Sequence, residues 1–242
     1  MPLWTETLAA LLGAERWLLP AECLLCRAAV HTAPDDPLIC SLCRSRWNPI
    51  PDPVCDRCGQ PLDRDLECRI CEGWPAGFRG VRSAVWLSGT ARDAVHALKY
   101  NGWRRAADGI VPVMTKLEPV RNGSVLVPIP LGAARRRERG YNQSAELARA
   151  LGRLVSLPVD EARLERRRET ARQTGLAPDA RRANLEGAFA ARVAPGERPV
   201  LVDDVFTTGA TLLAAAEALL AAGAAEVSAV TFARAVRPLD DL

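Results

Sequence analysis

The residues best suited to chemistry lie in one run near the end of the chain, where a short apolar stretch leads into two adjacent aspartates, Asp203 and Asp204. A turn rich in threonine and glycine follows, and it opens into a helix rich in alanine and leucine. The residues of this turn are Thr207, Thr208, Gly209, Ala210 and Thr211. Backbone N–H groups converge at the start of such a helix, and the helix dipole favours a bound anion. The sequence therefore predicts a loop that binds a phosphate monoester.

The two aspartates need a different role, because adjacent carboxylates would repel a bare phosphate. They are suited to accept hydrogen bonds from the vicinal hydroxyls of a ribose, with Mg²⁺ nearby. A phosphate site beside a diol site indicates ribose 5-phosphate as part of the ligand. The alternative is a strand end followed by an ordinary helix cap at Thr207 or Thr208. A cap requires only one such residue, so the whole D-D-x-x-T-T-G-x-T series favours the ribose phosphate.

A second set of reactive residues lies in the first third of the chain, where eight cysteines form four C-x-x-C pairs. The pairs are Cys23 and Cys26, Cys40 and Cys43, Cys55 and Cys58, and Cys68 and Cys71. Two such turns complete the tetrahedron of thiolates that Zn²⁺ accepts, so the four pairs predict two zinc sites. All ligands would be protein sulfur, which leaves no open position for water and indicates structural rather than catalytic zinc.

The sequence indicates the identity of the metal more firmly than it indicates which two C-x-x-C turns share one zinc ion. The short gaps within 23–43 and 55–71 favour joining the first pair to the second and the third to the fourth, although an interleaved arrangement stays open. Redox-active or unpaired core cysteines are the alternatives to zinc, and four regular repeats with glycine and proline nearby argue against both. His31, between the first two pairs, is interpreted as a loop residue and not as a ligand.

Composition and charge restrict the class of protein. The 242 residues, 48% of them hydrophobic, can bury one core and a small appendage. The net charge of +3 identifies no partner, but arginines crowd the middle of the chain, where anions are expected. The stretch 1–20 has no basic start and no long apolar run, so we expect no membrane span and a cytoplasmic location. Disulfides are disfavoured in that compartment, which again favours zinc.

Strands and helices alternate in the rest of the chain, which predicts an α/β fold with a mostly parallel sheet flanked by helices. The expected strands are 81–87, 124–129, 199–203 and 227–233, and the expected helices are 90–100, 142–155 and 210–222. Ligands of such sheets bind beyond the carboxyl ends of the strands, so the loops after Ile129 and Val202 should hold the site. A linker at 72–80 separates a cysteine-rich domain, 1–75, from the α/β domain, 81–236.

The aspartate–threonine loop resembles the signature with which type I phosphoribosyltransferases bind 5-phosphoribosyl-1-pyrophosphate (PRPP), and its neighbours narrow the match to the ComF family of competence-associated proteins. Three further blocks carry the resemblance: A-L-K-Y-x-G at 97–102, V-P-I-P-L at 127–131 with R-G-Y-N-Q at 139–143, and a third at 168–189. Family members commonly begin with a double zinc ribbon, so the resemblance covers nearly the whole chain. It implies a type I phosphoribosyltransferase-like fold, two structural Zn²⁺ ions, and Mg²⁺ bound with PRPP.

The resemblance also implies PRPP-binding residues outside the loop. They are Lys99, Pro130, Arg139, Arg168 and Arg182. The turn at Pro130 would hold the pyrophosphate, and the segment 167–182 resembles the mobile loop that closes over the substrate in related enzymes. For each basic residue the alternative is a solvated surface position. Tyr141 is interpreted as a core residue and His96 as a structural one.

The first functional hypothesis is a phosphoribosyltransferase, a pentosyl-transferring enzyme in which a nucleophile displaces pyrophosphate from C1 of the ribose. Asp203 and Asp204 would hold the sugar and stabilise the cationic transition state. The sequence does not specify the acceptor. A second hypothesis, implied by the family, is a non-catalytic protein of DNA uptake that binds single-stranded DNA or competence proteins through its zinc module and arginines. A third is a regulator that senses PRPP.

The cysteine pattern predicts about two zinc ions per chain. Elemental analysis of the purified protein would measure this content. Replacing Cys23 or Cys58 with serine should cause loss of soluble protein, because metal binding supplies most of the folding free energy of so small a module. A zinc-free chain, or a Cys58→Ser variant with full zinc content, would contradict the assignment.

Overall fold

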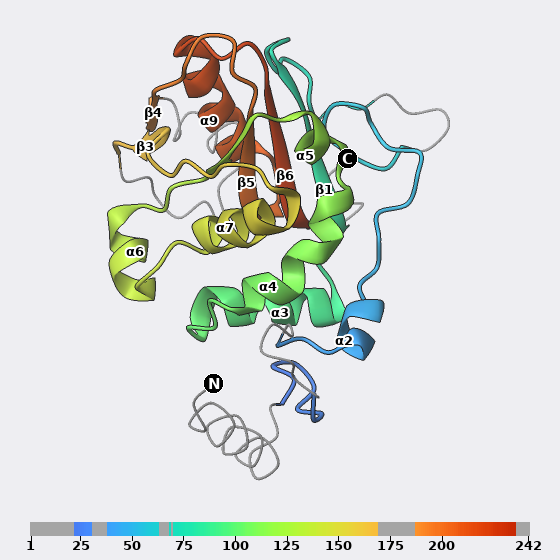
Figure 1. Cartoon of the computed structure of the whole chain (residues 1–242). Helices are drawn as coiled ribbons and strands as arrows, with labels where there is room; N and C mark the ends of the chain where they lie inside the picture. Colours follow the sequence, from blue (N-terminus) through green and yellow to red (C-terminus); the bar gives the residue numbers. More distant parts are fainter. Residues whose placement is uncertain (1–21, 31–37, 63–67, 69, 169–186, 236–242) are drawn as a thin grey trace, which may run out of the picture.

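A four-stranded parallel sheet forms the centre of the molecule (Figure 1). The computed structural model describes residues 22–30, 38–62, 68, 70–168 and 187–235. The strands of the sheet are β1 (Phe78–Trp86), β2 (Val125–Pro128), β5 (Pro199–Phe206) and β6 (Val227–Arg234). Their order is β1-β6-β5-β2, and every neighbouring pair is parallel. The predicted parallel α/β fold is confirmed.

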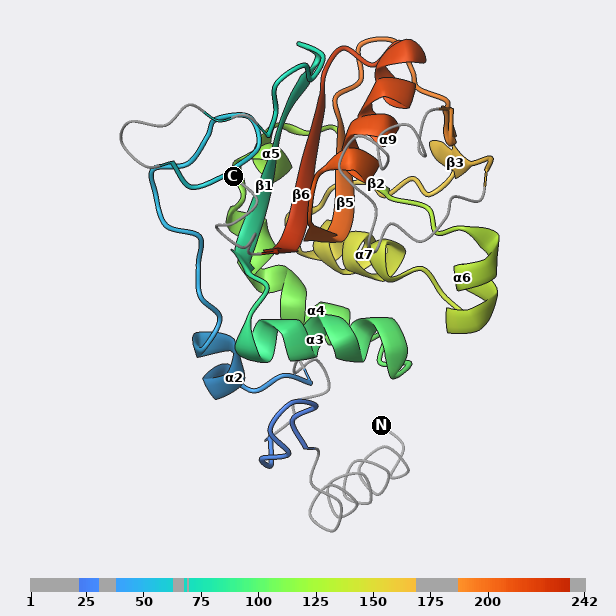
Figure 2. The same ribbon diagram turned by 180° about the vertical axis from the view of Figure 1, so that it is seen from behind.

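Two hydrophobic cores lie on opposite faces of this sheet (Figures 1 and 2). Along β5, Val200 and Val202 pack into one core and Leu201 into the other, which is the period of two that a strand imposes. The first face is covered by α3 (Gly89–Tyr100), α4 (Ala106–Ile110), the 3₁₀ helix η1 (Val111–Lys116) and α7 (Gln143–Val155). The second is covered by α9 (Ala210–Ala221) and the antiparallel pair β3 (Leu164–Arg166) and β4 (Phe189–Ala191).

Three short helices complete the elements in the described part of the chain: α2 (Ser41–Ser45), α5 (Glu118–Asn122) and α6 (Ala133–Arg139). The helix α6 has no buried residue, and Arg135, Arg136 and Arg137 on it are exposed. Among the described residues, no helix combines the length and the apolar character that crossing a membrane requires.

Two strands are longer than the sequence indicated. β1 begins at Phe78, three residues before the predicted start, because pairing with β6 begins there. β5 continues past Asp203 to Phe206, because its backbone still pairs with β6 at that point. Part of the predicted linker at 72–80 thus belongs to the sheet. Trp74, also in that stretch, is buried and stacks on Phe78 with ring centroids 4.8 Å apart.

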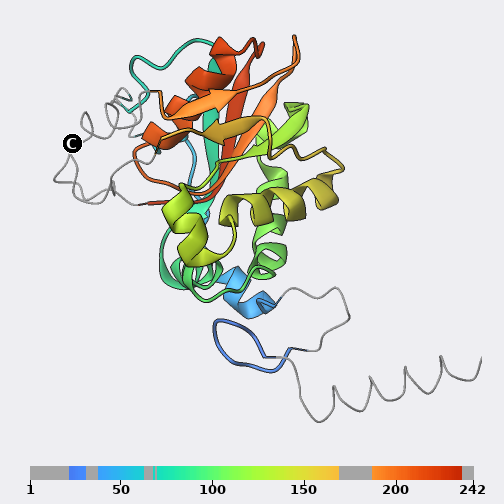
Figure 3. The ribbon, with the colours of Figure 1, turned by 90° about the vertical axis from the view of Figure 1, so that its left-hand side faces the viewer.

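The two groups of cysteines contact different parts of the α/β core. The first group, 23–43, packs beneath the helical layer, where the Thr90 hydroxyl of α3 donates to the Cys43 carbonyl at 3.0 Å. Figure 3 shows this blue segment at the end of the molecule remote from α9. The second group, 55–71, runs beside the edge strand β1, where the Val81 N–H donates to the Arg57 carbonyl at 2.7 Å. Each group therefore extends a different core.

Replacing Arg57 with methionine should destabilise the junction between the second cysteine group and β1. The Arg57 guanidinium donates to the carbonyls of Trp74 (3.2 Å), Pro75 (2.8 Å) and Phe78 (3.2 Å), and these acceptors would lose their partner. We expect the free energy of unfolding to fall by about 1.5–3 kcal/mol, as measured by urea denaturation.

The matched control is Arg79→Met. In the part of the chain that the structure describes, Arg79 forms a solvent-exposed ion pair with Glu226 at 3.6 Å, so its loss should change the stability by less than about 1 kcal/mol. Equal losses in the two variants would show that the Arg57 hydrogen bonds do not stabilise the junction.

Candidate functional site

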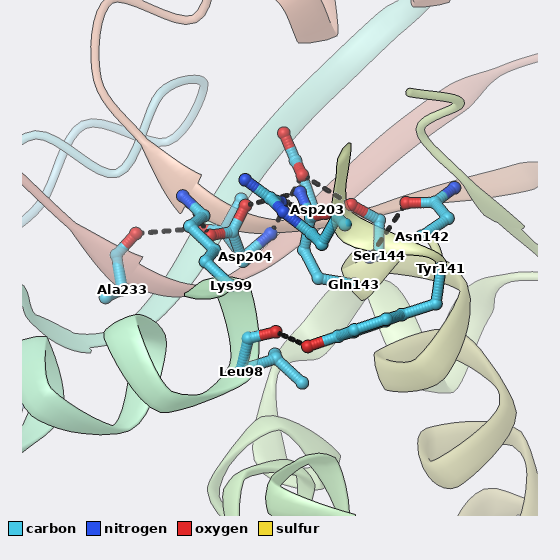
Figure 4. A network of polar contacts seen from close by, with 11 residues as sticks. Leu98, Lys99, Tyr141, Asn142, Gln143, Ser144, Asp203, Asp204 and Ala233 are labelled. Carbon is cyan, nitrogen blue, oxygen red and sulfur yellow. Dashed lines mark hydrogen bonds and ion pairs between the residues drawn. The ribbon is translucent and has the colours of Figure 1, made fainter. Parts of the chain in front are cut away.

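The two aspartates in the second half of β5 lie at the centre of a polar network (Figure 4). The Asp204 carboxylate is buried and forms an ion pair with the ammonium of Lys99, which comes from the last turn of α3. The Gln143 amide at the start of α7 donates to the other oxygen of Asp204 at 3.4 Å. Two helices that are far apart in the sequence therefore converge on one carboxylate.

The start of α7 is held in place by its own N-cap. The Asn142 side chain accepts a hydrogen bond from the Ser144 N–H at 3.1 Å and donates to the carbonyl of Ile129 at 2.9 Å. This fixes the Ser144 hydroxyl, which donates to Oδ1 of Asp203 at 2.7 Å. The loop after β2 and the end of β5 are thus joined at the aspartate pair, as expected for the carboxyl edge of a parallel sheet.

Ser144 and Gln143 were not predicted as site residues. The available signal was a cap residue, Asn142, followed by two polar residues at the start of a helix whose other inward positions are apolar. Both residues are buried, at 0% and 5% exposure. A buried polar side chain needs a partner, and the aspartates supply one.

The two carboxyl groups have opposite pKa shifts. Burial raises the pKa of Asp203 to about 7, and the neighbouring negative charge of Asp204 acts in the same direction. Burial also opposes ionisation of Asp204, but the Lys99 ammonium outweighs it and lowers the pKa of Asp204. The pKa of Lys99 is raised, because its attraction to Asp204 exceeds the cost of burial. The pair therefore combines a carboxylate whose ionised form is favoured with one that gains or loses a proton near neutral pH.

The predicted phosphate loop follows directly. Thr207 is exposed, whereas Oγ1 of Thr208 is buried and has no hydrogen-bond partner among the described residues. Gly209 is in the left-handed region (φ +79°), and a Cβ there would come within 2.9 Å of the Phe206 ring. Ala210 begins α9, and Thr211 lies in its first turn. An unpartnered buried hydroxyl next to a helix N-terminus suits an anionic ligand.

The other predicted site residues differ in how they relate to the aspartates. The guanidinium of Arg139 donates to Gln143 and lies over the Tyr100 ring, 5.2 Å from its centroid, so it joins the network through Gln143. Pro130 follows β2 at the same edge of the sheet, and Arg168 follows β3. Arg182 and the rest of 169–186 lie outside the described residues.

Tyr141 is confirmed as a core residue. It is 6% exposed, its hydroxyl donates to the carbonyl of Leu98, and the Arg104 guanidinium lies 4.8 Å from its ring centroid. The hydroxyl therefore links the start of α7 to the helix that carries Lys99.

The cysteines form two groups of four, each with all sulfurs within 4.8 Å of one another. Cys23, Cys26, Cys40 and Cys43 make one group, and Cys55, Cys58, Cys68 and Cys71 the other, as in the sequential pairing. Sulfurs at about 2.3 Å from a shared zinc would be about 3.8 Å apart. The shorter Sγ–Sγ distances include 3.7 and 3.8 Å in the first group and 3.3, 3.6 and 3.9 Å in the second.

Backbone N–H groups also point at the sulfurs. The N–H of Cys40 donates to Sγ of Cys23, and that of Cys43 to Sγ of Cys40, both at 3.4 Å. Such bonds stabilise thiolates, so the donor set fits a structural Zn²⁺ bound by four cysteines.

Comparison with protein families matches two models to the chain, the double zinc ribbon domain at residues 14–72 and the phosphoribosyl transferase domain at residues 138–240. Competence protein ComFC of Bacillus subtilis (strain 168) is 30% identical over 233 residues, which cover 88% of this chain and 94% of that protein. DNA utilization protein YhgH of Escherichia coli (strain K12) is 31% identical over 221 residues, 86% of this chain and 95% of that one. Competence protein F of Haemophilus influenzae is 28% identical over 227 residues, 88% and 97% of the two chains.

Replacing Asp203 with asparagine should stabilise the protein at alkaline pH. Because the native pKa of about 7 exceeds that of an aspartate in an unfolded chain, the wild-type protein loses stability as the pH rises through the window from about 4 to about 7. The asparagine variant lacks this titration. Its melting temperature relative to wild type should therefore rise by a few degrees between pH 4.5 and pH 8.

A Ser144→Ala variant provides the comparison, because losing the Ser144 hydroxyl removes a hydrogen bond that favours the ionised form of Asp203. In the Ser144→Ala background the divergence caused by Asp203→Asn should still begin at about pH 4, but it should keep growing to a higher pH and reach a larger final value. If the difference in melting temperature between Asp203→Asn and wild type does not change with pH, ionisation of Asp203 carries no cost in the fold.

Proposed function

The chain belongs to the ComF family of competence-associated proteins, and on that premise we propose that it binds PRPP with Mg²⁺ and transfers the 5-phosphoribosyl group to an acceptor. The observation that carries the proposal is the adjacency of an unequal carboxylate pair, Asp203 and Asp204, and a loop with an unpartnered buried hydroxyl, Thr208. A diol site and a phosphate site side by side are what a ribose 5-phosphate requires.

The phosphate end of the ligand would lie in the loop 207–211. Gly209 lets the backbone turn at a position where no side chain fits, and the N-terminus of α9, with the positive end of its dipole, begins at the next residue. Thr208 would give the phosphate a hydroxyl donor that no other described residue uses. Each of these groups supports the phosphate assignment independently.

The sugar end would lie against Asp203. This carboxyl group has a pKa near neutral pH, so it can release its proton to solvent, and the ionised form can accept hydrogen bonds from the ribose diol. Lys99 keeps Asp204 ionised and in place. Carboxylate oxygens and phosphate oxygens together are the donor set that Mg²⁺ prefers. The ion would supply positive charge to the departing pyrophosphate.

In the proposed reaction the bond between C1 of the ribose and the pyrophosphate oxygen breaks, and a bond from C1 to the acceptor forms. The electron pair leaves with the pyrophosphate, and the acceptor loses its proton to solvent or to a nearby base. No covalent nucleophile from the chain is needed. Asp203 and Asp204 would stabilise the positive charge that develops on the sugar, and Pro130, Arg139, Arg168 and Arg182 stay our candidates for holding the pyrophosphate.

The biological setting that we propose is the uptake and use of DNA, as the names of the competence and DNA utilization relatives suggest. A second candidate function on the same fold is non-catalytic binding of single-stranded DNA. The observation that favours it is an exposed aromatic pair, Tyr100 at 65% and Trp103 at 45%, near the arginine-rich surface of α6. Stacking aromatics with arginines are the usual components of single-strand binding sites.

Calorimetric titration of PRPP with Mg²⁺ into the purified protein tests the proposal. Wild type should bind saturably, and the Asp203→Asn, Asp204→Asn double variant should lose binding, because the diol and the metal lose both carboxylates. Thr208→Val is a sharper single change, since it removes only the hydroxyl at nearly constant volume. We expect it to weaken binding about five- to tenfold.

The matched control is an Asp160→Asn, Glu161→Gln double variant, which removes the same charge from surface ion pairs with Arg163 and Arg149. It should bind PRPP as wild type does. If wild type shows no binding while a salt-sensitive shift of single-stranded DNA is seen, the second candidate function replaces the first.

A further inference from the structure

Arg234, the last residue of β6, is a buried arginine that the proposed reaction does not use. The residue is 2% exposed, and its guanidinium donates to the carbonyl of Cys58 at 2.7 Å and to Oε1 of Gln60 at 2.8 Å. The same guanidinium lies over the Phe206 ring, 4.3 Å from its centroid. A buried charge is costly unless its donors are satisfied, so an arginine held this way needs an explanation.

Phe206 connects Arg234 to the phosphate loop. It ends β5, and its ring lies so close to Gly209 that a Cβ there would come within 2.9 Å of it. The N–H of Ala235, the residue after Arg234, donates to the Phe206 carbonyl at 2.9 Å. The end of β6 therefore holds both the ring and the backbone on which the turn at Gly209 rests.

The second cysteine group reaches the same turn through Trp74. A Cβ at Gly209 would come within 3.1 Å of the Trp74 ring, and the Trp74 N–H donates to the carbonyl of Cys71 at 3.2 Å. Cys55, Cys58 and Cys71 are buried in the same hydrophobic core as Phe206 and Trp74. The turn thus lies against two rings, and both residues are linked to this group. Trp74 is linked through its backbone N–H, and Phe206 through Arg234.

Electrostatic attraction also favours the contact between Arg234 and the second cysteine group. Four thiolates around one Zn²⁺ leave net negative charge on the cluster, which favours a guanidinium at the Cys58 carbonyl. In the first cysteine group, the described residues Cys23 and Cys43 pack instead into the core on the other face of the sheet, with residues of α3 and α4.

We propose that Arg234 is a positioning residue for the phosphate loop, and that through it the second cysteine cluster controls the affinity of the loop for a ribose phosphate. The ligand in this statement rests on the proposed function, whereas the structural link from cluster to loop does not. Loss of metal from the second cluster would loosen the loop, and loss from the first would leave it in place.

The test compares Arg234→Met with Arg163→Met in the full-length, zinc-loaded protein. Arg163 is a matched control, because it also forms partly buried bonds, to Glu197 at 2.7 Å and Asp160 at 2.8 Å, and neither bond involves a cysteine group or the loop 207–211. Three quantities are measured: zinc content, amide hydrogen exchange of the peptide covering 203–213, and affinity for PRPP with Mg²⁺.

In Arg234→Met we expect unchanged zinc content, exchange in the loop faster by about tenfold, and affinity for PRPP weaker by about tenfold. Arg163→Met should change neither loop exchange nor affinity. Arg234→Lys, which retains the charge and one donor, should restore part of both. A loop that exchanges as in wild type, or exchange that rises equally throughout both arginine variants, overturns the inference.

If Arg234→Met does not fold, Gln60→Ala takes its place, because it removes only one acceptor of Arg234. Faster loop exchange in that variant supports the inference, and unchanged exchange overturns it. Failure of wild type to bind PRPP would overturn the proposed function alone, since the exchange measurement needs no ligand.

Discussion

The ion pair between Lys99 and Asp204 is the interaction on which the rest of the site depends. Two carboxyl groups in sequence at the buried end of a strand would repel each other, and a fold could not keep both ionised without a counter-charge. Lys99 supplies that charge to one of them. Ionisation of Asp203 stays unfavourable, because the group is buried and lies beside the negative charge of Asp204, and its pKa is therefore raised. This carboxyl group therefore reduces the stability of the fold at neutral pH.

The parallel sheet sets a second constraint, because both of its faces must be covered. Helices cover most of each face, and the two cysteine groups cover what the helices leave. Trp47, next to the first group, packs edge-on against Phe232 of β6 with centroids 4.9 Å apart. The second group adds Trp74 and Phe78 on the opposite side. The metal-binding segments are therefore part of the packing around the sheet, and their metals stabilise more than their own loops.

Sequence alone predicted the sheet, the position of the aspartates at its carboxyl edge, and both cysteine groups, since these follow from local patterns. Lys99 was predicted as a basic residue of the site, but its choice of Asp204 as partner was not. Ser144 and Gln143 escaped prediction because a polar residue at a helix start has many suitable partners. Only the tertiary arrangement selects one.

Arg234 and Trp74 were harder still. A charged residue at a strand end usually faces solvent, and a tryptophan in a stretch rich in glycine and proline resembles a linker position. Their roles depend on contacts between segments more than a hundred residues apart. The periodicity of hydrophobic residues along the sequence does not indicate such contacts.

The close packing around Gly209 has an evolutionary consequence. Any side chain at this position would have to displace the ring of Phe206 or of Trp74, so a substitution there becomes tolerable only after one of the rings has become smaller. The three positions come from two parts of the chain: Trp74 follows the second cysteine group, and Phe206 and Gly209 belong to the loop region. In related sequences, a substitution at one of these positions should be accompanied by substitutions at the others.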